Sequence, residues 1–594
     1  MKCKGFIPRS EHPDPQWARK TFYNLNGEWD FEIDRSSSGY ERGLADKASL
    51  YSKIIVPFCP ESSLSGIGKT DFLNTVWYKK TVNFDLSALT GKRVILHFGA
   101  ADYKTRVWIN GKSAGDEHIG GFSPFEFDIT DLLVNGDNII TVCCDDDPRD
   151  PSQPVGKQSE KSFSYGCHYT RVTGIWQTVW YEIVPLSYIK KMKLVTDPDA
   201  STVSLSLELC GCGSLLCEAF YEGKKVGEAS RAYAEGVASI ELTLSEQHLW
   251  QVGKGGLYDL RITFGDDIVE SYFGLRRVSL KDGRLLINGS PVFMRLVLDQ
   301  GYYPKGLYTA QSESDLIRDI ELAVSAGFNG ARPHQKVFEP RYLYHADKLG
   351  FLLFGEYGSW GIDLSDPANV KSFLPDWLGC VERDINHPSV IGWCPFNETS
   401  HTANPKGAEQ DPDFIRLIYD ETKRCDPTRP CIDASGWTHV KTDIYDVHDY
   451  TQSPEQMHER YDALFKEGKL YDRFSEVWQL YREWRGLEGP IQQWHGEPVF
   501  MSEYGGIGLH IVSDKDRATA WSYGNAAKSL EEFYERYKGL TDALLDNPKM
   551  IGFCYTQLYD IEQEQNGLCT YDRKPKIDMS VLKQINSRGA AIED

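Results

Sequence analysis

The amino-acid sequence predicts three modules in series: a jelly-roll β-sandwich, an immunoglobulin-like β-sandwich and a (β/α)8 barrel. The chain has 594 residues, more than one hydrophobic core supports, since domains usually hold about 100–200 residues. Short apolar or alternating runs separated by turn signals fill the first part, where helical periodicity is almost absent. From Arg277 onward, short apolar runs alternate with helix-like stretches, which is typical of a β/α protein.

Residues 1–185 form the first predicted module. Its strand candidates are "TVWYKKTVNF", "RVILHFGA", "TRVWINGK", "NIITVCC" and "IWQTVWYEIV", and signals such as "VNGDN" mark the turns. Many short strands without helices predict a jelly roll. Residues 186–275 continue in this style with "VSLSLELCG", "SIELTL" and "YDLRITF". A segment of about 90 residues with this spacing suits an immunoglobulin-like sandwich.

Residues 276–594 form the third predicted module. Its eight strand candidates are "PVFMRLVL", "FNGARP", "FLLFGEY", "SVIGWCPF", "PCIDAS", "DIYDVHDY", "PVFMSEYG" and "MIGFCYTQ". The intervals can hold helices, and the first, "SESDLIRDIELAVSAG", has Ser312 or Ser314 as its candidate N-cap. Eight such units over about 300 residues predict a (β/α)8 barrel. A doubly wound sheet is the alternative, but no Gly-rich fingerprint opens the first unit.

Composition excludes several classes of function. With 41% hydrophobic and 25% charged residues, the chain has the composition of an ordinary globular protein. The formal net charge of −21 argues against nucleic acid and anionic membranes as partners, because both require a basic surface. The sequence has no apolar run long enough to span a membrane and no signal-peptide h-region. The fourteen cysteines show no CxxC pairs with zinc spacing. We therefore expect a cytoplasmic protein with mostly reduced thiols.

Two glutamates follow strand candidates of the predicted barrel. Glu398 comes after the fourth candidate, in "IGWCPFNETS", and Glu503 ends the seventh, in "PVFMSEYGG". The carboxyl ends of barrel strands form one active-site face, so both side chains are expected to reach the same mouth. Paired carboxylates there suggest cleavage of a glycosidic bond, with Asn397 binding the sugar 2-hydroxyl. The alternative is that each glutamate is only a solvated or capping residue.

The motifs "FNETS", "MSEYGG", "FNGARPHQ", "LNGEWDF", "VWYKK", "VWINGK" and "GIWQTVW" together resemble glycoside hydrolase family 2, in order and over essentially the whole chain. The resemblance implies the same three modules. It also implies a retaining double displacement in which Glu398 is the general acid/base and Glu503 is the nucleophile. The two carboxyl groups are then expected to lie about 5–5.5 Å apart.

Further candidate site residues follow the other strand candidates. The resemblance and the strand-end positions give these candidate substrate-binding residues: Asp299, Arg332, His334, Glu356, Asn397, Trp437, His448, Tyr450, Tyr555 and Asn566. Tyr450 resembles the tyrosine that bonds the nucleophile, whereas Arg332 is equally compatible with a structural role. Tyr555 either floors the sugar site or belongs to the barrel core. Trp360 and Trp437 either stack on sugar faces or pack internally.

Departures from the resemblance bear on the sugar. Glucuronidases similar to this chain carry Asn-x-Lys near the C-terminus, and that lysine binds the substrate carboxylate. Here Asn566 is present but Leu568 stands at the lysine position, and Arg573 or Lys574 would have to replace the ammonium. The "NGL" stretch instead resembles β-galactosidases. The altered "LDQGYYP" stretch, which contains Asp299 and Gln300, keeps arabinosidases, xylosidases, galactofuranosidases and galacturonidases open.

The resemblance implies no metal and no cofactor. Large galactosidases bind magnesium through histidines that this sequence lacks after the third strand candidate and after Glu503. A carbohydrate is the expected partner, most similar to a β-galactosidase substrate. A β-glucuronidase, galacturonidase or arabinosidase of the same family is the alternative, and a catalytically inactive carbohydrate-binding protein is the alternative from another class.

Two segments outside the strand ends are candidates for shaping the site. The helical insertion between the sixth and seventh strand candidates either walls the aglycone site or is an ordinary amphipathic helix. "FSYGCHYTRVTG" in the jelly roll is a candidate to reach the barrel mouth, with His168 and Arg171 as its residues of interest. The sequence leaves the sugar, the linkage and the oligomeric state open, including whether the protein is a homo-oligomer.

Overall fold

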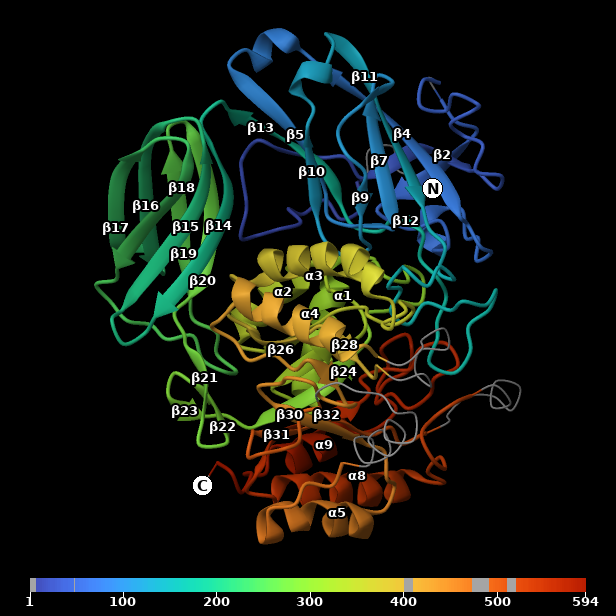
Figure 1. The fold of residues 1–594 in the computed structure, drawn as a ribbon, viewed down its shortest axis with the longest axis vertical. Helices are drawn as coiled ribbons and strands as arrows, with labels where there is room; N and C mark the ends of the chain where they lie inside the picture. Colours follow the sequence, from blue (N-terminus) through green and yellow to red (C-terminus); the bar gives the residue numbers. More distant parts are fainter. Residues whose placement is uncertain (1–6, 48, 400–409, 473–490, 510–519, 594) are drawn as a thin grey trace.

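A computed structural model describes residues 7–47, 49–399, 410–472, 491–509 and 520–593. Two β-sandwiches, one blue to teal and one green, lie side by side against a barrel that is coloured from yellow-green to red (Figure 1). The predicted fold class, with a jelly roll, an immunoglobulin-like sandwich and a (β/α)8 barrel, is confirmed. The residue boundaries between the modules stay predictions.

The jelly roll packs two antiparallel sheets around its own core. In β7 the buried Thr105, Val107 and Ile109 alternate with more exposed neighbours, as expected for a strand with one face on a core. One sheet has the order β1 (Phe22–Asn24), β13 (Val179–Pro185), β5 (Lys92–Phe98) and β10 (Phe125–Asp128). The other has the order β3 (Ser52–Val56), β2 (Gly27–Ile33), β4 (Thr75–Phe84), β11 (Gly136–Asp145), β7 (Lys104–Ile109) and β8 (Lys112–Ser113), with β9 (His118–Ile119) on β7. A short pair, β6 (Ala101–Asp102) and β12 (Gly174–Ile175), lies apart.

The second sandwich packs a three-stranded sheet on a four-stranded sheet. In β15 the buried Val203, Leu205, Leu207 and Leu209 alternate with more exposed residues and join the core of this sandwich. The sheets have the orders β14 (Tyr188–Asp197), β15 (Thr202–Cys210), β18 (Gly236–Thr243), and β17 (Lys224–Tyr233), β16 (Gly213–Tyr221), β19 (Leu257–Phe264), β20 (Asp267–Gly274). A small sheet of β21 (Val278–Lys281), β22 (Arg284–Ile287) and β23 (Ser290–Pro291) leads into the barrel.

The barrel strands are parallel and buried on both faces, as all-parallel sheets must be when helices cover them. Their order is β27 (Val390–Cys394), β26 (Leu352–Glu356), β25 (Gly330–Pro333), β24 (Met294–Asp299), β32 (Met550–Thr556), β31 (Val499–Gly505) and β30 (Tyr445–Asp449). The fifth predicted strand fills the remaining gap, since Cys431 bridges Trp393 and β29 (Ala434–Ser435) pairs with β28 (Phe396–Asn397).

Helices follow the strands as the alternation predicts. At the first helix Asp315 accepts the backbone N–H of Ser312 at 3.0 Å, so Ser312 is its N-cap. The described helices are α1 (Glu313–Ser325), α2 (Pro340–Leu349), α3 (Val370–Asp384), α4 (Pro412–Cys425), α5 (Pro454–Glu467), α8 (Leu530–Leu545) and α9 (Met579–Asn586). Short 3-10 turns are η1 (Ser63–Ser65), η2 (Leu86–Leu89), η3 (Thr130–Leu132) and η4 (Pro367–Asn369). Helix α5 forms the first part of the predicted insertion, and residues 473–490 of that insertion lie outside the described residues.

The jelly roll and the barrel share a continuous interface. Phe122, Tyr169 and Trp176 of the jelly roll belong to the hydrophobic cluster of the barrel. The backbone N–H of Thr170 donates to Glu562 at 3.1 Å, in the loop after β32. The segment between β11 and β12 therefore runs along the carboxyl end of the barrel, where the teal chain descends in Figure 1.

The described helices include none that is long and apolar enough to cross a membrane. The cysteines of the described residues are free thiols, and Cys143 and Cys144 are both buried.

Candidate active site

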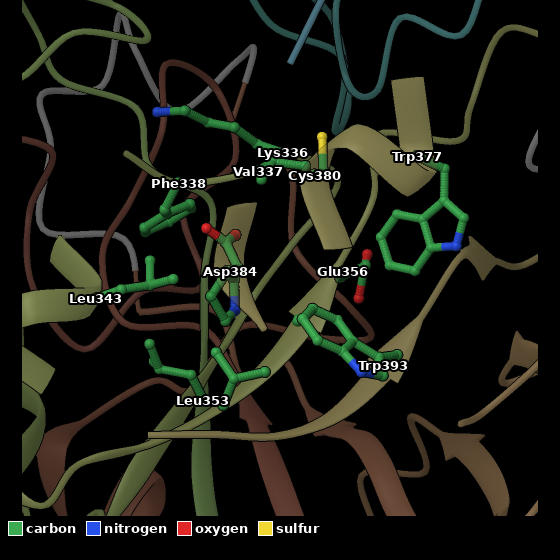
Figure 2. Close-up of a pocket in the computed structure, with 13 residues that line it drawn as sticks. Lys336, Val337, Phe338, Leu343, Leu353, Glu356, Trp377, Cys380, Asp384 and Trp393 are labelled. Carbon is green, nitrogen blue, oxygen red and sulfur yellow. The ribbon is translucent and has the colours of Figure 1, made fainter. Parts of the chain in front are cut away.

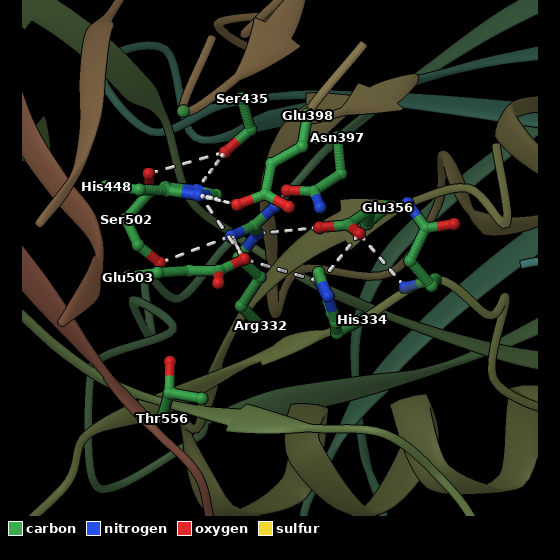
Figure 3. A network of polar contacts seen from close by, with 12 residues as sticks. Arg332, His334, Glu356, Asn397, Glu398, Ser435, His448, Ser502, Glu503 and Thr556 are labelled. Carbon is green, nitrogen blue, oxygen red and sulfur yellow. Dashed lines mark hydrogen bonds and ion pairs between the residues drawn. The ribbon is translucent and has the colours of Figure 1, made fainter. Parts of the chain in front are cut away.

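The two predicted glutamates meet at the carboxyl end of the barrel (Figure 3). One carboxylate oxygen of Glu398 and one of Glu503 lie within 4.8 Å of each other, although the residues come from β28 and β31. Glu398 has a backbone φ of +44°, in the left-handed region that few residues other than glycine adopt. Its N–H donates to the carbonyl of Ser435 at 2.9 Å, which holds this strained residue against β29.

Arg332 on β25 connects three strand ends. Its Nη1 donates to Oε1 of Glu503 at 2.8 Å and its Nη2 donates to Oδ1 of Asn397 at 2.7 Å. Its Nε lies 2.6 Å from Oε2 of Glu356. A buried guanidinium with fixed donors in one plane orients carboxylates better than a flexible ammonium does, so Arg332 is a positioning residue. Asn397 is left with a buried Nδ2 that has no hydrogen-bond partner among the described residues and is available to a ligand.

The surroundings of Glu503 keep it ionised. Burial alone would raise its pKa, but His448, His334, Arg332 and Lys157 outweigh burial and lower the pKa to about 2. Burial and neighbouring cations in turn lower the pKa of His334, so at neutral pH that histidine is uncharged and the other three groups carry the effect. The hydroxyl of Tyr450 also donates to Oε2 of Glu503. Glu503 is therefore an anion with both oxygens held.

His448 lies between the two glutamates. Its Nδ1 is 2.7 Å from Oε1 of Glu398, and its Nε2 is 3.5 Å from Oε1 of Glu503. Burial disfavours the imidazolium, but the charge of Glu503 and the hydrogen bond with Glu398 outweigh burial and raise the pKa of His448. His448 is therefore in hydrogen-bond contact with Glu398 and couples the two carboxylates electrostatically. The side chain of Glu398 is 23% exposed and that of Glu503 is 3% exposed, so Glu398 is the group open to a leaving group or water.

A second buried network supports the site from behind. The carboxylate of Asp446 accepts hydrogen bonds from the Ser435 hydroxyl at 2.5 Å and from the Ser502 hydroxyl. His439 lies 2.7 Å from Asp433 and 3.3 Å from Asp446. Burial opposes protonation, but these two carboxylates outweigh burial and raise the pKa of His439 from 6.5 to about 9.

This network predicts a pH dependence of stability. Because the folded-state pKa of His439 exceeds the unfolded value, its contribution is complete below pH 6.5 and is lost as the pH rises to 9. That loss amounts to about 3 kcal/mol. The difference in melting temperature between the unmodified protein and His439→Gln should be largest at pH 6 and smallest at pH 9. Parallel curves for the two proteins would show that His439 is neutral in the folded state.

The structure corrects two predicted substrate-binding residues. Asp299 pairs in register with Pro333, on the face opposite to Leu298 and Arg332, so it points toward the helices. Its carboxylate accepts the backbone N–H of Gly301 at 2.9 Å and the hydroxyl of Tyr342 in α2 at 3.2 Å. Asp299 is therefore structural, because successive strand residues alternate faces.

The prediction that Tyr555 binds the sugar is also wrong, because its side chain packs toward the helices and not into the site. Its ring lies 4.9 Å from Tyr537 of α8 and 5.5 Å from Tyr504, and it is fully buried. It belongs to the barrel core, which was the alternative interpretation of this residue. Its neighbour Thr556 lies near the network of Figure 3. The hydroxyl of Thr556 is 3.1 Å from that of Tyr450.

The other predicted residues keep their place near the carboxyl end. Trp360 donates its Nε1–H to the carbonyl of Asn397 at 2.9 Å, and Trp437 is the second residue after β29. Asn566 donates to Glu564 at 3.1 Å in the loop after β32. His168 reaches the mouth, with its ring 5.5 Å from Trp360. The roles of these residues stay predictions.

Arg171 does not reach the site. It donates to the carbonyls of Ser159, Lys161 and Thr70 within the jelly roll. Its guanidinium carbon also lies 4.3 Å from the centre of the Phe72 ring.

Sequence reasoning missed several residues that surround the glutamates. Ser435 and Ser502 lie at the ends of strand candidates, so the strand-end argument could have found them. Lys157 and Glu564 come from loops, and no spacing in the sequence marks them. Their placement depends on how the jelly roll docks on the barrel.

A separate cavity lies on the outside of the barrel, between its strands and helices α2 and α3 (Figure 2). Its lining is mostly apolar and includes Phe338, Leu353, Trp377 and Trp393. Only the residue Glu356 connects it to the network of Figure 3 among the residues the structure describes. It is a packing gap behind the strands.

The three groups Glu398, His448 and Glu503 have the spacing of a possible metal site. A cation there would have to displace the donors Arg332 and Tyr450 from Glu503. The arrangement suits a different chemistry, because an ionised carboxylate and a second, more exposed carboxyl group lie within 4.8 Å of each other.

Two close carboxyl groups at the carboxyl end of a (β/α)8 barrel are the arrangement that a retaining glycoside hydrolase requires. Comparison with known families agrees: "Glycosyl hydrolases family 2, sugar binding domain" matches residues 68–179 and "Glycosyl hydrolases family 2, TIM barrel domain" matches residues 278–589. The chain belongs to glycoside hydrolase family 2 and is a retaining glycosidase.

The similar proteins have two different activities. A β-glucuronidase of Streptococcus agalactiae is 22% identical over 627 residues, covering 96% of both chains. A β-galactosidase of Leuconostoc mesenteroides is 25% identical and covers 81% of this chain, which spans only 43% of that protein. A solved β-glucuronidase from Ruminococcus gnavus, in complex with D-glucuronic acid, has a TM-score of 0.75 at 19% identity and covers 97% of this chain and 99% of its own.

Proposed function

We propose that the protein is an exo-acting β-glycosidase in which Glu503 is the nucleophile and Glu398 is the general acid/base. The observation that carries the proposal is the pair of carboxylate oxygens within 4.8 Å, with only one of the two side chains open to solvent. In the first step Glu503 attacks the anomeric carbon, the bond to the leaving oxygen breaks, and Glu398 protonates that oxygen. In the second step Glu398 takes a proton from water, which attacks the anomeric carbon and releases Glu503.

The charges of the site fit these roles. Glu503 starts as an anion because Arg332 and Tyr450 donate to it and cations surround it. His448 holds a proton beside Glu398, so the acid can be recharged through the imidazole. When the glycosyl-enzyme forms, Glu503 loses its negative charge, and Glu398 then gives up its own proton more readily and can act as the base.

We propose a β-galactosidase-like substrate, with a β-glucuronide, a galacturonide or an arabinoside as the alternative. Leu568 is fully buried and donates its N–H to the carbonyl of Gln557, so no ammonium stands at that position. Arg573 pairs with Asp319 at 3.0 Å, and the side chain of Lys574 is 78% exposed. The names of the most similar proteins favour a glucuronide instead.

A panel of aryl glycosides tests this proposal. We expect release of p-nitrophenol from the β-galactoside at least tenfold faster, in kcat/KM, than from the glucuronide, galacturonide, arabinoside, xyloside and mannoside, because pocket contacts discriminate sugars by about 1–3 kcal/mol. If another sugar of the panel is hydrolysed fastest, that sugar replaces the galactoside as the proposed substrate. If no member is hydrolysed, the proposed activity is contradicted.

A further inference from the structure

Lys157, in the jelly-roll segment between β11 and β12, is a buried cation without a partner. The residue is only 4% exposed. Its ammonium forms no hydrogen bond, and no ion pair within 4.0 Å, with any residue that the structure describes. Its nearest recorded contact is the Trp360 ring, with Nζ 5.3 Å from the ring centre. The Nζ atom is not among the fully buried polar atoms of the described residues, so the buried stem presents the ammonium to an open space that a ligand can occupy.

The backbone around Lys157 is fixed against the barrel. The N–H of Val155 donates to the carbonyl of Trp360 at 2.7 Å, and the N–H of Tyr169 donates to the carbonyl of Lys157 at 2.7 Å. Gly156 has a φ of +61°, and a Cβ at this position would meet the carbonyl oxygen of Gln335 at 2.3 Å. Only glycine allows this close approach, so the jelly roll delivers the next residue, Lys157, rigidly to the barrel mouth.

The carboxylates of the site act electrostatically on this ammonium. Burial alone would lower the pKa of Lys157, but the negative charges of Glu564, Glu503 and Glu398 outweigh burial and raise it. Lys157 in turn contributes to the low pKa of the nucleophile Glu503. The side chain is therefore charged at neutral pH, and it lies beside Trp360, whose indole N–H donates to the carbonyl of Asn397 in the site.

Glu564 is the matching acceptor. It is fully buried, and it accepts hydrogen bonds from the Tyr169 hydroxyl and from Nδ2 of Asn566 at 3.1 Å. The Oδ1 atom of Asn566 is buried and has no hydrogen-bond partner within the part of the chain that the structure describes. Lys157 and Glu564 influence each other electrostatically but stand more than 4.0 Å apart, so no direct ion pair closes the space between them.

We infer that Lys157 and Glu564 bind neighbouring hydroxyl groups of the terminal sugar, Lys157 as donor and Glu564 as acceptor, and thereby select a neutral sugar over a uronic acid. This inference rests on the proposed function and adds residues of the sugar-binding module to its site. A hydroxyl group can both donate and accept a hydrogen bond, so a fixed donor and a fixed acceptor at separate positions can bind two neighbouring hydroxyls. A uronate would add a fifth carboxyl group to Glu356, Glu398, Glu503 and Glu564, while Arg332 already pairs with Glu356 and Glu503.

Paired variants test this inference. Lys157→Met removes the ammonium at similar length, and Lys161→Met is the matched control, because Lys161 is an exposed lysine four residues further along the same segment. On the best neutral aryl glycoside we expect Lys157→Met to lower kcat/KM roughly 10- to 150-fold, the range for a hydrogen bond to a charged group. The control should stay within twofold of the unmodified protein. Glu564→Gln should raise the ratio of uronide to neutral-sugar turnover.

Sugar-induced thermal shifts decide the same question without turnover. D-Galactose should raise the melting temperature of the unmodified protein and of Lys161→Met but not that of Lys157→Met. In the unmodified protein and in Lys161→Met, D-galactose should raise the melting temperature more than D-galacturonate does. Equal shifts in all three proteins, or kcat/KM of Lys157→Met within twofold, would overturn the role of Lys157. A larger shift with galacturonate would overturn the selection of a neutral sugar. If the protein hydrolyses no glycoside, the proposed function fails, while these shifts still decide the inference.

Discussion

Replacing the proposed nucleophile should abolish hydrolysis. An added external nucleophile should then restore turnover and give a product with the opposite anomeric configuration. In Glu503→Ala we expect kcat on every aryl glycoside to fall by about 10⁴-fold or more, because no covalent intermediate can form. Added azide should restore turnover by attacking the anomeric carbon from the face that the carboxylate vacates, so that the product is the α-glycosyl azide. The product configuration is measured by NMR. Arg332 and Tyr450 still surround the site, so substrate binding is expected to persist.

Glu535→Ala is the control for this substitution, since Glu535 lies exposed on α8. It should retain full activity and show no response to azide. A β-glycosyl azide from Glu503→Ala, or a residual kcat within tenfold of the unmodified protein, would contradict the role of Glu503 as nucleophile.

Replacing the acid/base should produce a loss that depends on the leaving group. In Glu398→Ala we expect the rate of the first step to fall by about 10³-fold or more for phenyl glycosides, which need a proton on the leaving oxygen. For 2,4-dinitrophenyl glycosides the loss should stay within about tenfold, because that phenolate leaves unprotonated. Pre-steady-state bursts of dinitrophenol measure the first step separately from the second.

Azide distinguishes the two glutamates in the second step as well. In Glu398→Ala the glycosyl-enzyme on Glu503 is intact, so azide should yield the β-glycosyl azide, opposite to the product of Glu503→Ala. Equal losses for good and poor leaving groups would remove Glu398 from the acid role. His448 would then be the first residue to examine, since its Nδ1 lies 2.7 Å from Glu398.

Much of the fold follows from patterns in the sequence. Alternation in runs such as "TVSLSLELC" marks strands that have one face on a core, and Val203, Leu205 and Leu207 are buried as that pattern predicts. Eight apolar runs separated by helix-length intervals are enough to predict the barrel. Strand ends then predict that Glu398 and Glu503 converge, because all parallel strands deliver their carboxyl ends to one face.

The sequence could not show which side of a barrel strand each residue faces. Both faces of β24 and β32 are apolar and buried, so no alternation marks the inward set. Thr556, the residue after Tyr555, faces the site, whereas Asp299 and Tyr555 themselves point away from it. The register between neighbouring strands decides which residues of a strand face the barrel interior, and only the structure shows this register.

Lys157 illustrates a second limit. Its position depends on the docking of one module on another, through Gly156 against Gln335 and Val155 against Trp360. Nothing local in "VGKQSEK" distinguishes this lysine from its exposed neighbour Lys161. Residues that a sandwich contributes to a barrel site become visible only when both modules are placed.

The covalent intermediate tests the mechanism most directly. A 2-deoxy-2-fluoro glycoside of the preferred sugar with a good leaving group slows both steps and should trap the glycosyl-enzyme. Proteolysis and mass spectrometry then locate the sugar. Our account predicts one sugar per chain, attached to Glu503 in the peptide that contains "PVFMSEYGG". A label on Glu398 or another residue, or rapid inactivation without any attached sugar, would contradict it.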